Sequence, residues 1–477
     1  MRKRNVKNKS TNLLQNKEKL IKLPISKFID TKFREYAIYV LEQRGIPNFY
    51  DALTPVQRYI LKNAPNSFNK TLTLVGKCIE CGYHHGNAAL ESSIARLARP
   101  FGNSFQLLEG DGFFGTEVSP LPAAARYTGI KLSSNANKII NKYDHLTTKE
   151  PEGPYDPLWV EIPIGLSLPV IGIAVGYKSM ILPRNLKHVE EFLAGKRKSV
   201  KPYFEGFTGK IEKYKELGNA WLISANMEVT DNRISINSIP PIVKYESVLK
   251  KLDYLINKYE SNIRVIDNSN NVVDLTIIYT GKNSVDWTNI LKYVEKAFSI
   301  IVSENVVFIK DSQVLVYRNV EEYLEDFKWQ LIRLKQKNTQ HEFERTVANL
   351  DFNVAKEKFI TFMLSKKRTD KEVTEWLKDY VKDIRERLER MTARKFTIDE
   401  LQATKEIIKE LQAEGKTLKK QLKEITKEFE SHVDPTLARG IHSEKSNVDL
   451  FDTDDIEIID GITIWNGSDG DECEIDE

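Results

Sequence analysis

A tyrosine that stands behind a run of small residues and beside an arginine is the feature of this chain with the clearest chemical potential. Tyr127 follows Arg126 directly, and the segment Pro122-Ala123-Ala124-Ala125 precedes the pair. A phenol is a poor nucleophile at neutral pH because its pKa is about 10, so it needs a neighbouring cation and a base. An arginine can also hold a phosphate through two parallel hydrogen bonds. The pair therefore favours covalent phosphate chemistry, although tyrosine beside arginine is common and is usually structural.

Other segments in the same part of the chain could supply the base and further cations. His84 and His85 are closely flanked by glycines, and an imidazole can accept a proton near neutral pH. Arg44 opens the run Arg44-Gly45-Ile46-Pro47, and Arg58 stands in the next segment. A glycine-rich run, Gly110-Asp111-Gly112-Phe113-Phe114-Gly115, comes shortly before the tyrosine. Each signal is weak alone, but the ordered set is specific.

Cys78 and Cys81, with two histidines just behind them, offer a competing interpretation as a zinc site. Structural zinc needs four converging ligands, and the sequence has no second CxxC or HxxxH pair. The two cysteines also lie one helical turn apart in a segment with a helical pattern. A zinc-bound architectural protein is therefore the weaker alternative, and we predict no metal ligand in this chain.

The composition indicates a multidomain protein that is neither secreted nor inserted in a membrane. The length of 477 residues is too great for one compact core. Hydrophobic residues make up 41% and charged residues 29%, and no apolar run is long enough to cross a bilayer. The first residues lack the apolar region of a secretory signal. Because three cysteines fit a reducing compartment, we expect a cytoplasmic protein.

Charge is concentrated at the two ends, although the net charge is only +3. Residues 1–24 form a basic arm, which suits a phosphate backbone, and residues 441–477 form an acidic tail, which suits a basic partner. Two solvated, disordered ends are an equally acceptable interpretation.

Hydrophobic periodicity divides the chain between these ends into three parts. Residues 25–150 show helical spacing in four segments, and glycine-punctuated apolar runs from residue 105 then predict turns and a small β-wing. Residues 151–315 mix strands with helices; the strand-like segments are 162–176, 220–229, 233–239 and 272–281, and one helix is expected at 248–259.

Residues 316–440 show two heptad seams. The first comprises Val320, Leu324, Phe327, Leu331 and Leu334, and the second comprises Ile408, Leu411, Leu418, Leu422, Ile425 and Phe429. A denser apolar segment around Phe359, Trp376 and Tyr380 lies between them. The pattern predicts an antiparallel coiled-coil arm with a globular tip, and an ordinary helical bundle is the simpler alternative.

Taken in order, these motifs resemble the DNA-breakage subunits of type IIA DNA topoisomerases, a family that includes gyrase A, the A subunit of topoisomerase IV and the C-terminal half of eukaryotic topoisomerase II. The phage form, the medium subunit, is the nearest likeness. The resemblance covers about residues 30–210 by motif and the heptad region by architecture. It implies an α+β multidomain fold with a winged-helix cleavage domain (25–150), an α/β tower domain (151–315) and a coiled coil with a dimerising globular tip (316–440).

The resemblance also implies roles for individual residues. Tyr127 matches the tyrosine that forms a transient 5′-phosphotyrosyl link, and Arg126 matches the neighbouring arginine that steadies the phosphate. His85 matches the histidine proposed to assist proton transfer, and Arg44 matches an arginine supplied by the opposite protomer. Ile173 matches an isoleucine that wedges between bases and bends the duplex. Read from its pattern alone, Ile173 is a core strand residue.

Further DNA-binding candidates are basic residues near these motifs, since duplex binding depends mainly on phosphate neutralisation. They are Arg58, His84, Lys77, Lys131 and Lys178. Asn87 stands where relatives usually have an acid, Thr54 where they often have a lysine, and Lys131 where an arginine is common. These departures put fine positioning in doubt, but not the reaction.

The family resemblance places the cofactors on another chain. The segment Glu109-Gly110-Asp111 looks like the acidic signature of the Mg²⁺-binding TOPRIM module but lacks its Asp-x-Asp partner, and no phosphate-binding G-x-x-x-x-G-K-[ST] loop occurs. Mg²⁺ and ATP would therefore be held by a gyrase B-like ATPase/TOPRIM subunit, in a heteromer built on a homodimer of this chain. Its substrate would be duplex DNA, in the cytoplasm or nucleoid of a host cell if the gene is phage-borne.

Two functions of different class follow. The first is the DNA-breakage and rejoining subunit of an ATP-dependent type II topoisomerase, which relaxes and decatenates DNA by double-strand passage. The second is a non-catalytic winged-helix DNA-binding scaffold that a coiled coil dimerises.

Overall fold

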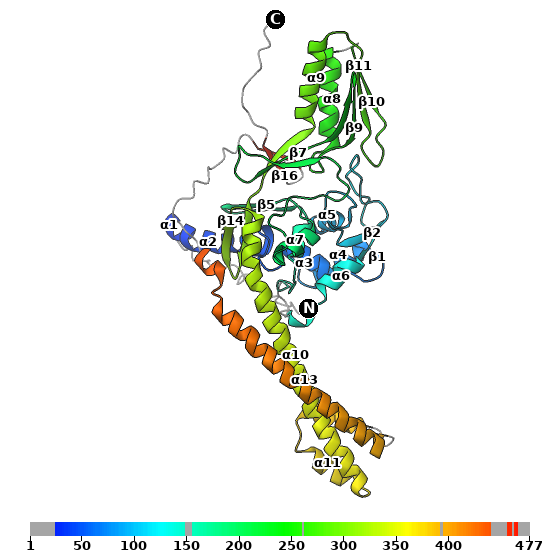
Figure 1. Cartoon of the computed structure of the whole chain (residues 1–477), viewed down its shortest axis with the longest axis vertical. Helices are drawn as coiled ribbons and strands as arrows, with labels where there is room; N and C mark the ends of the chain where they lie inside the picture. The colour runs from blue at the N-terminus through cyan, green and yellow to red at the C-terminus, as the bar shows by residue number, and fades with distance from the viewer. Residues whose placement is uncertain are drawn as a thin grey trace, which may run out of the picture.

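The computed structural model describes residues 24–147, 155–259, 262–391 and 395–439, together with a short hairpin of β15 (Ile456–Ile459) and β16 (Ile462–Trp465). The predicted basic arm and acidic tail lie outside the described residues, apart from Pro24 and that hairpin. The described chain is elongated, with a pair of long helices at one end, a helix-covered sheet at the other and a mixed body between them (Figure 1). The predicted mixed helix-and-sheet architecture is confirmed.

The chain begins with one helical rod that contains two π-helical turns. Its segments are α1 (Ile25–Phe28), η1 (Ile29–Phe33), α2 (Arg34–Val40) and η2 (Leu41–Gly45). The helical spacing of the first segment rests on Phe33, Tyr36, Ala37, Val40 and Leu41. Phe33 and Tyr36 are exposed here, and only Leu41 of these five is buried. The rod ends before Pro47, as expected from the restriction that proline places on its neighbours.

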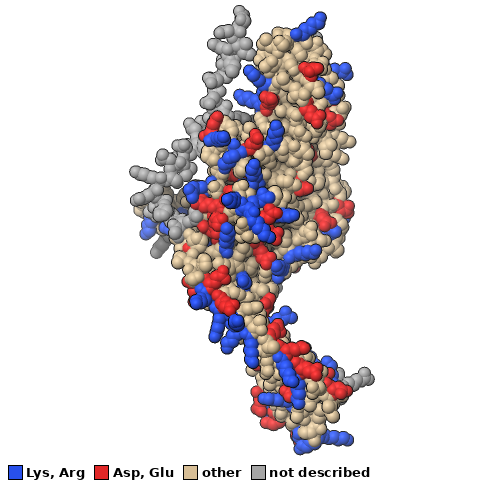
Figure 2. Space-filling view, in the orientation of Figure 1, with Lys and Arg blue, Asp and Glu red and all other residues tan. Residues whose placement is uncertain are grey.

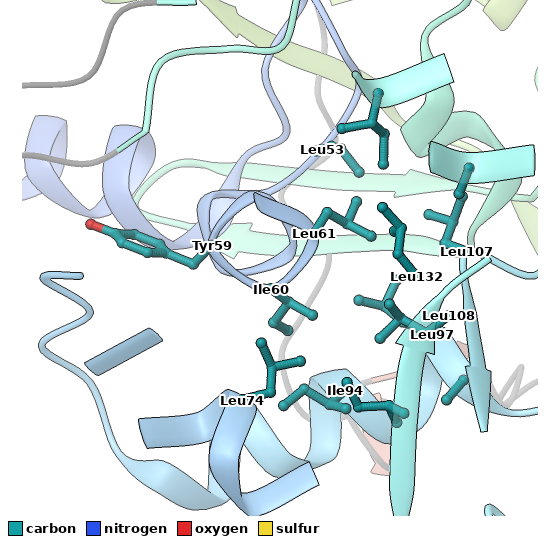
Figure 3. Packing of buried hydrophobic residues seen from close by; sticks show 14 of the residues in the cluster. Leu53, Tyr59, Ile60, Leu61, Leu74, Ile94, Leu97, Leu107, Leu108 and Leu132 are labelled. Atoms are coloured by element: carbon teal, nitrogen blue, oxygen red, sulfur yellow. The ribbon is translucent and has the colours of Figure 1, made fainter. Parts of the chain in front are cut away.

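Three helices and a small sheet then form the first core. The helices are α3 (Pro55–Asn63), α4 (Thr71–Glu80) and α5 (Asn87–Ala98), and the strands are β1 (Asn69–Lys70), β2 (Leu108–Asp111) and β3 (Gly129–Leu132), in the order β1-β3-β2. Thr54 and Gln57 form a capping box at the start of α3. Leu90, Ile94 and Leu97 bury one face of α5 in the core that also contains Ile60 and Leu74. Figure 3 shows Ile94 and Leu97 in this packing. The predicted helices and β-wing are therefore present.

The middle of the body joins segments that are distant in the sequence. It contains α6 (Ser134–Ile140), η3 (Asp144–Leu146), η4 (Ile164–Ser167), α7 (Leu186–Leu193) and two antiparallel hairpins, β4 (Val170–Ala174) with β5 (Tyr177–Ile181) and β13 (Val306–Lys310) with β14 (Gln313–Tyr317). Arg184 and Glu304 form a buried ion pair of 2.7 Å, and Trp221 Nε1 donates to the same carboxylate at 2.7 Å. This network fixes the body to the sheet that follows.

The helix-covered part contains two sheets. One has the order β12-β7-β6, and the other has the order β10-β11-β9-β8. Their bounds are β6 (Lys210–Lys213), β7 (Ala220–Ser224), β8 (Asn226–Thr230), β9 (Arg233–Ser238), β10 (Ile263–Asp267), β11 (Leu275–Tyr279) and β12 (Ser299–Ser303). Helices α8 (Tyr245–Tyr259) and α9 (Ser284–Ala297) lie side by side against the four-stranded sheet (Figure 1) and share its core.

Two long helices, α10 (Val320–Ser365) and α13 (Ile398–Ser431), pack antiparallel beyond the body (Figure 1). Trp329 meets Phe429 near one end, and Lys356 pairs with Glu400 at 2.6 Å near the other. Between them, α11 (Asp370–Leu377) and α12 (Lys382–Glu389) enclose an apolar cluster with Phe359, Trp376 and Tyr380, and η7 (Pro435–Arg439) follows α13. Within the described part of the chain, no helix combines the length and apolar character needed to cross a membrane.

The first heptad seam does not face the second helix at its start. Val320, Leu324 and Phe327 pack into the body core with Phe49 and Phe308. The prediction of a seam that pairs helix with helix was therefore wrong for these residues. Heptad spacing shows that a face is covered, but not which element covers it.

Candidate active site

Tyr127 lies on an exposed turn immediately before β3. Its backbone N–H donates to the carbonyl of Ala124 at 2.9 Å, and the residue is 71% exposed. The guanidinium carbon of Arg126 lies 5.8 Å from the centre of the tyrosine ring. An exposed phenol beside a guanidinium is open to a large substrate, whereas a buried phenol would have ruled out the predicted chemistry.

The residue after the tyrosine is firmly anchored. The Thr128 carbonyl accepts a hydrogen bond of 3.0 Å from the backbone N–H of Thr71, and the two buried threonine hydroxyls are 2.8 Å apart. Strand pairing between β1 and β3 continues this contact. The turn therefore presents an exposed side chain from a fixed backbone, because its C-terminal end is part of the first core.

The glycine-rich run lies directly against the tyrosine. Gly112 has a φ of +101°, and a Cβ there would lie 3.4 Å from the carbonyl oxygen of Tyr127. Glycine is required at this position because residues with a side chain rarely adopt that φ. The backbone N–H of Ala123 donates to the Phe113 carbonyl at 2.9 Å, which closes the loop on itself.

His85 lies just before α5, with its ring edge-on to Tyr83 at a centroid distance of 5.2 Å. Burial lowers the pKa of His85 below its ordinary value, and the positive charges of Arg44 and His84 lower it further. The neutral imidazole is thereby favoured, and a neutral imidazole can accept a proton. Arg44 is exposed, and its neighbour Gln43 lines one pocket with Tyr83, His84 and His85, so the chain segment of Arg44 lies beside the histidine pair.

We expect the His85 imidazole to titrate below the ordinary histidine pKa of about 6.5. Replacing Arg44 with glutamine removes a neighbouring positive charge, so the midpoint should move upward in Arg44→Gln. NMR titration of histidine-labelled protein measures this, with His85→Gln to assign the signal and Lys382→Gln, at the far tip, as a charge-matched control. A midpoint that stays fixed in Arg44→Gln would contradict the proximity of the two groups.

Ile173 and Lys178 face each other across the β4–β5 hairpin. Ile173 is 55% exposed, which differs from the buried core residue that its pattern alone would indicate. Lys178 is half-buried, and desolvation lowers its pKa. An exposed apolar side chain beside a partly desolvated cation suits the predicted wedge, which stays a prediction.

Arg58 does not suit its predicted role in DNA binding. Arg58 is only 5% exposed. Its Nε donates to Asp51 Oδ2 at 2.8 Å and its Nη2 donates to Asp51 Oδ1 at 3.1 Å, and Asp51 is fully buried. The Arg58 guanidinium also donates to the carbonyl of Tyr155 at 3.3 Å. A guanidinium whose donors are used in the interior has no open face for a phosphate, so Arg58 is a structural residue.

The remaining DNA-binding candidates lie at the surface to different degrees. Lys77 on α4 and His84 are exposed. Lys131 pairs with Glu109 at 2.8 Å across β2 and β3 and lies 4.8 Å from the centre of the Phe68 ring. The visible face of the protein mixes acidic with basic side chains over the middle body (Figure 2), so on this face positive charge is not continuous.

A pocket of about 590 Å³ lies beneath the segment that precedes the tyrosine. Its lining combines Arg44, Arg96 and Arg99 with the segments 120–125 and 240–244. Arg99 is largely desolvated: burial and the charge of Arg96 lower its pKa to about 10, and its Nε has no hydrogen-bond partner among the described residues. The contribution of residues 240–244 was missed from sequence, because nothing local marks a segment more than a hundred residues away.

The described residues do not form a metal site. Among residues 24–147, 155–259, 262–391 and 395–439, no three His, Cys, Asp or Glu side chains gather closely enough to hold an ion. Glu109 is paired with Lys131, and Cys78 is buried with its thiol 3.6 Å from the Tyr59 carbonyl. Glu109, Cys78 and their neighbours therefore do not fit Mg²⁺ or zinc on their own.

Comparison with known proteins gives a consistent picture over most of the chain. The profile of the DNA gyrase/topoisomerase IV A-subunit family matches residues 44–434. The DNA topoisomerase medium subunit of Enterobacteria phage T4 is 28% identical over 385 residues, which are 74% of this chain and 85% of that protein. DNA topoisomerase 2 of Saccharomyces cerevisiae is 28% identical over 384 residues, which are 73% of this chain and 26% of that protein.

Two further similarities differ in extent. The DNA gyrase A protein of Buchnera aphidicola is 34% identical over 189 residues, which are 36% of this chain and 22% of that protein. The solved DNA-binding, cleavage and re-ligation domain of Plasmodium falciparum topoisomerase II superposes with a TM-score of 0.70 at 21% identity, over 85% of this chain and 64% of that one. The chain thus spans most of the phage protein but only about a quarter of the yeast and bacterial relatives.

Proposed function

This chain belongs to the family of DNA gyrase and topoisomerase IV A subunits, and from that premise we propose that it is the DNA-breakage and rejoining subunit of an ATP-dependent type II topoisomerase with Tyr127 as its nucleophile. The observation that carries the proposal is the exposure of Tyr127 on an anchored turn beside Arg126. A non-catalytic DNA-binding scaffold would not require an exposed phenol on a rigid backbone.

In the proposed reaction the Tyr127 oxygen attacks a backbone phosphorus of duplex DNA. A phosphotyrosyl bond to the 5′ phosphate forms, the bond from phosphorus to the 3′ oxygen breaks, and that oxygen leaves with a proton. The phenolic proton passes to a base, and His85 suits this role because its imidazole is held neutral. The bond energy is conserved in the link, so the 3′ hydroxyl can attack in reverse and reseal the strand.

Cationic side chains must stabilise the negative charge that develops on the attacked phosphate in the transition state. Arg126 is next to the nucleophile in the chain, whereas the segment that ends in Arg44 lies beside His85, and the Arg44 charge lowers the pKa of that histidine. We assign Arg44 and His85 to one unit that a second copy of the chain presents to Tyr127. This agrees with the expectation that Arg44 acts from the opposite protomer.

The domain roles follow the same proposal. Residues 25–150 form the winged-helix cleavage domain, residues 151–315 the tower and residues 316–440 the coiled-coil arm with a dimerising tip. The antiparallel packing of α10 on α13 and the apolar cluster between them support the last assignment. The first turns of α10 belong with the body, because their side chains lie in its core.

A partner subunit supplies what the described residues do not. We assign Mg²⁺ mainly to a TOPRIM module on a gyrase B-like subunit, which would also bind ATP, as the family resemblance implies. The assembly is a heteromer built on a homodimer of this chain. Since its substrate is duplex DNA, it works in the cytoplasm or nucleoid of the cell that holds that DNA.

The decisive test mixes the chain, its ATPase/TOPRIM partner, Mg²⁺ and a linear duplex, stops the reaction with detergent and then separates the two DNA strands by denaturation. A label at the 3′ end of the duplex should follow the protein, and a label at the 5′ end should be released, because the link is to the 5′ phosphate. The same mixture with ATP should relax supercoiled circles and separate linked ones. A non-catalytic scaffold would bind the duplex and leave neither label on the protein.

We expect duplex binding to weaken steeply with salt, and Lys77→Gln to reduce the salt slope by about one released ion. Lys77 is exposed on α4, the helix whose first residue, Thr71, is hydrogen-bonded to Thr128, so we expect loss of its charge to remove one phosphate contact. Lys382→Gln is the matched control, since that side chain is 87% exposed at the tip of the long helices. Fluorescence anisotropy across a salt series measures both, and equal slopes for the two variants would exclude Lys77 from the interface.

A further inference from the structure

Two glycines from distant segments touch backbone to backbone beside the candidate site. Gly45 ends η2 directly after Arg44, and Gly172 lies in β4 directly before Ile173. A Cβ on Gly172 would overlap the carbonyl oxygen of Gly45, and a Cβ on Gly45 would lie 2.6 Å from the carbonyl oxygen of Ile173. Neither glycine needs a positive φ, so close approach is the reason for glycine at both positions.

Hydrogen bonds hold both sides of this contact on the same strand. The backbone N–H of Ile309 in β13 donates to the Pro47 carbonyl at 2.9 Å, just after Gly45. The same β13 hairpin meets β5, where the Ser179 hydroxyl donates to the Val307 carbonyl at 2.9 Å. The segment that carries Arg44 and the hairpin that carries Ile173 are therefore tied together twice, once directly and once through β13.

Apolar side chains fill the space enclosed by these connections. Leu41, Ile46, Val307 and Ile309 are buried together, and Ala174 packs against them from the β4–β5 hairpin. Close-packed interiors transmit displacement because they contain little free volume. A shift of the hairpin must therefore move the end of η2, and a shift of η2 must move the hairpin.

We propose that the Gly45–Gly172 contact fixes Ile173 relative to Arg44, so that Gly172 is a positioning residue that couples insertion of the wedge into DNA to placement of a cation at the attacked phosphate. This inference rests on the proposed function and on the predicted wedge role of Ile173. The coupling would make cleavage depend on a bent duplex. Insertion of Ile173 would move the β4–β5 hairpin and the end of η2 together, and this movement would bring Arg44 to the attacked phosphate.

The test compares single-turnover formation of the covalent adduct by the holoenzyme carrying wild-type chain, Gly172→Ala, Arg44→Ala or both changes. We expect Gly172→Ala to slow adduct formation about 10- to 100-fold, the scale of loss for a displacement of about 1 Å. Its duplex affinity should stay within about threefold of wild type, since phosphate contacts dominate binding. Because Gly172 acts through Arg44, the double variant should be no slower than Arg44→Ala alone.

Two outcomes would overturn the inference while wild type still forms the adduct: a Gly172→Ala variant that cleaves at the wild-type rate, or a double variant whose loss is the product of the two single losses. If Gly172→Ala does not fold, Gly45→Ala applies a milder displacement at the same contact and is judged by the same comparison. Gly218→Ala, where an added Cβ meets nothing within 4 Å, is the matched control. If wild type itself forms no adduct, the proposed function has failed and this inference falls with it.

Discussion

A Tyr127→Phe holoenzyme is expected to bind duplex DNA as tightly as the wild type and to form no covalent adduct. The change removes one oxygen from a side chain that is 71% exposed, so neither packing nor the basic contacts should alter. Removal of a covalent nucleophile eliminates its pathway, and we expect adduct formation and DNA relaxation to fall by at least about 10⁴-fold. Detergent trapping of end-labelled DNA and a plasmid relaxation assay measure the two losses.

Tyr254→Phe is the matched control for this experiment. Tyr254 is 49% exposed on α8, in the helix-covered part of the molecule away from the candidate site (Figure 1). Its loss of a hydroxyl should leave adduct formation unchanged. A covalent protein–DNA species that persists in Tyr127→Phe would assign the nucleophile to a different residue.

An Arg58→Met variant is expected to lose stability and not DNA contacts. Asp51 is fully buried, and without Arg58 its carboxylate would keep only the backbone N–H groups of Leu53 and Leu158, each at 2.9 Å. Breaking a buried ion pair from one side typically costs about 3–5 kcal/mol. Thermal and urea unfolding should therefore show the transition of the body at lower temperature and lower urea concentration than in the wild type.

Arg318→Met provides the comparison for a surface pair. The Arg318 side chain is 86% exposed and pairs with Glu322 across the start of α10, so its loss should change the unfolding midpoint little. At a temperature where Arg58→Met is folded, its salt slope for duplex binding should match that of the wild type. A reduced slope with unchanged stability would restore the DNA-binding role that the sequence suggested for Arg58.

The sequence was a good guide wherever the determining interactions are local. The buried face of α5 follows from the spacing of Leu90, Ile94 and Leu97, and the start of α3 follows from Pro55 and its capping box. The glycine loop beside Tyr127 also follows from residue types, because glycine at positive φ marks a turn. These features depend on neighbours within a few residues.

Features that depend on distant partners could not be read in this way. The burial of Arg58 is imposed by Asp51 and by Tyr155, which lies 97 residues further along the chain. The proximity of Arg44 to His85, and of Gly45 to Gly172, is likewise set by how separate segments pack. Similarly, Phe327 has the spacing of a helix–helix seam but packs with Phe49 of the body. Hydrophobic periodicity identifies which face of a helix is buried, but not the element that buries it.

Helix α10 continues without a break from the body into the pair of long helices, so the pair should move with the body as a rigid extension. The Tyr323 ring is stacked on Phe308 at a centroid distance of 4.0 Å and its hydroxyl donates to the Phe49 carbonyl at 2.8 Å, so the root of the helix is clamped in the core. A helix of 46 residues is about 69 Å long at ~1.5 Å per residue. A tilt of about 5° at its root would carry the far tip through about 6 Å on that length. A small rotation of the body would therefore displace the far tip of the helices by a distance large enough to separate two side chains that are in contact there.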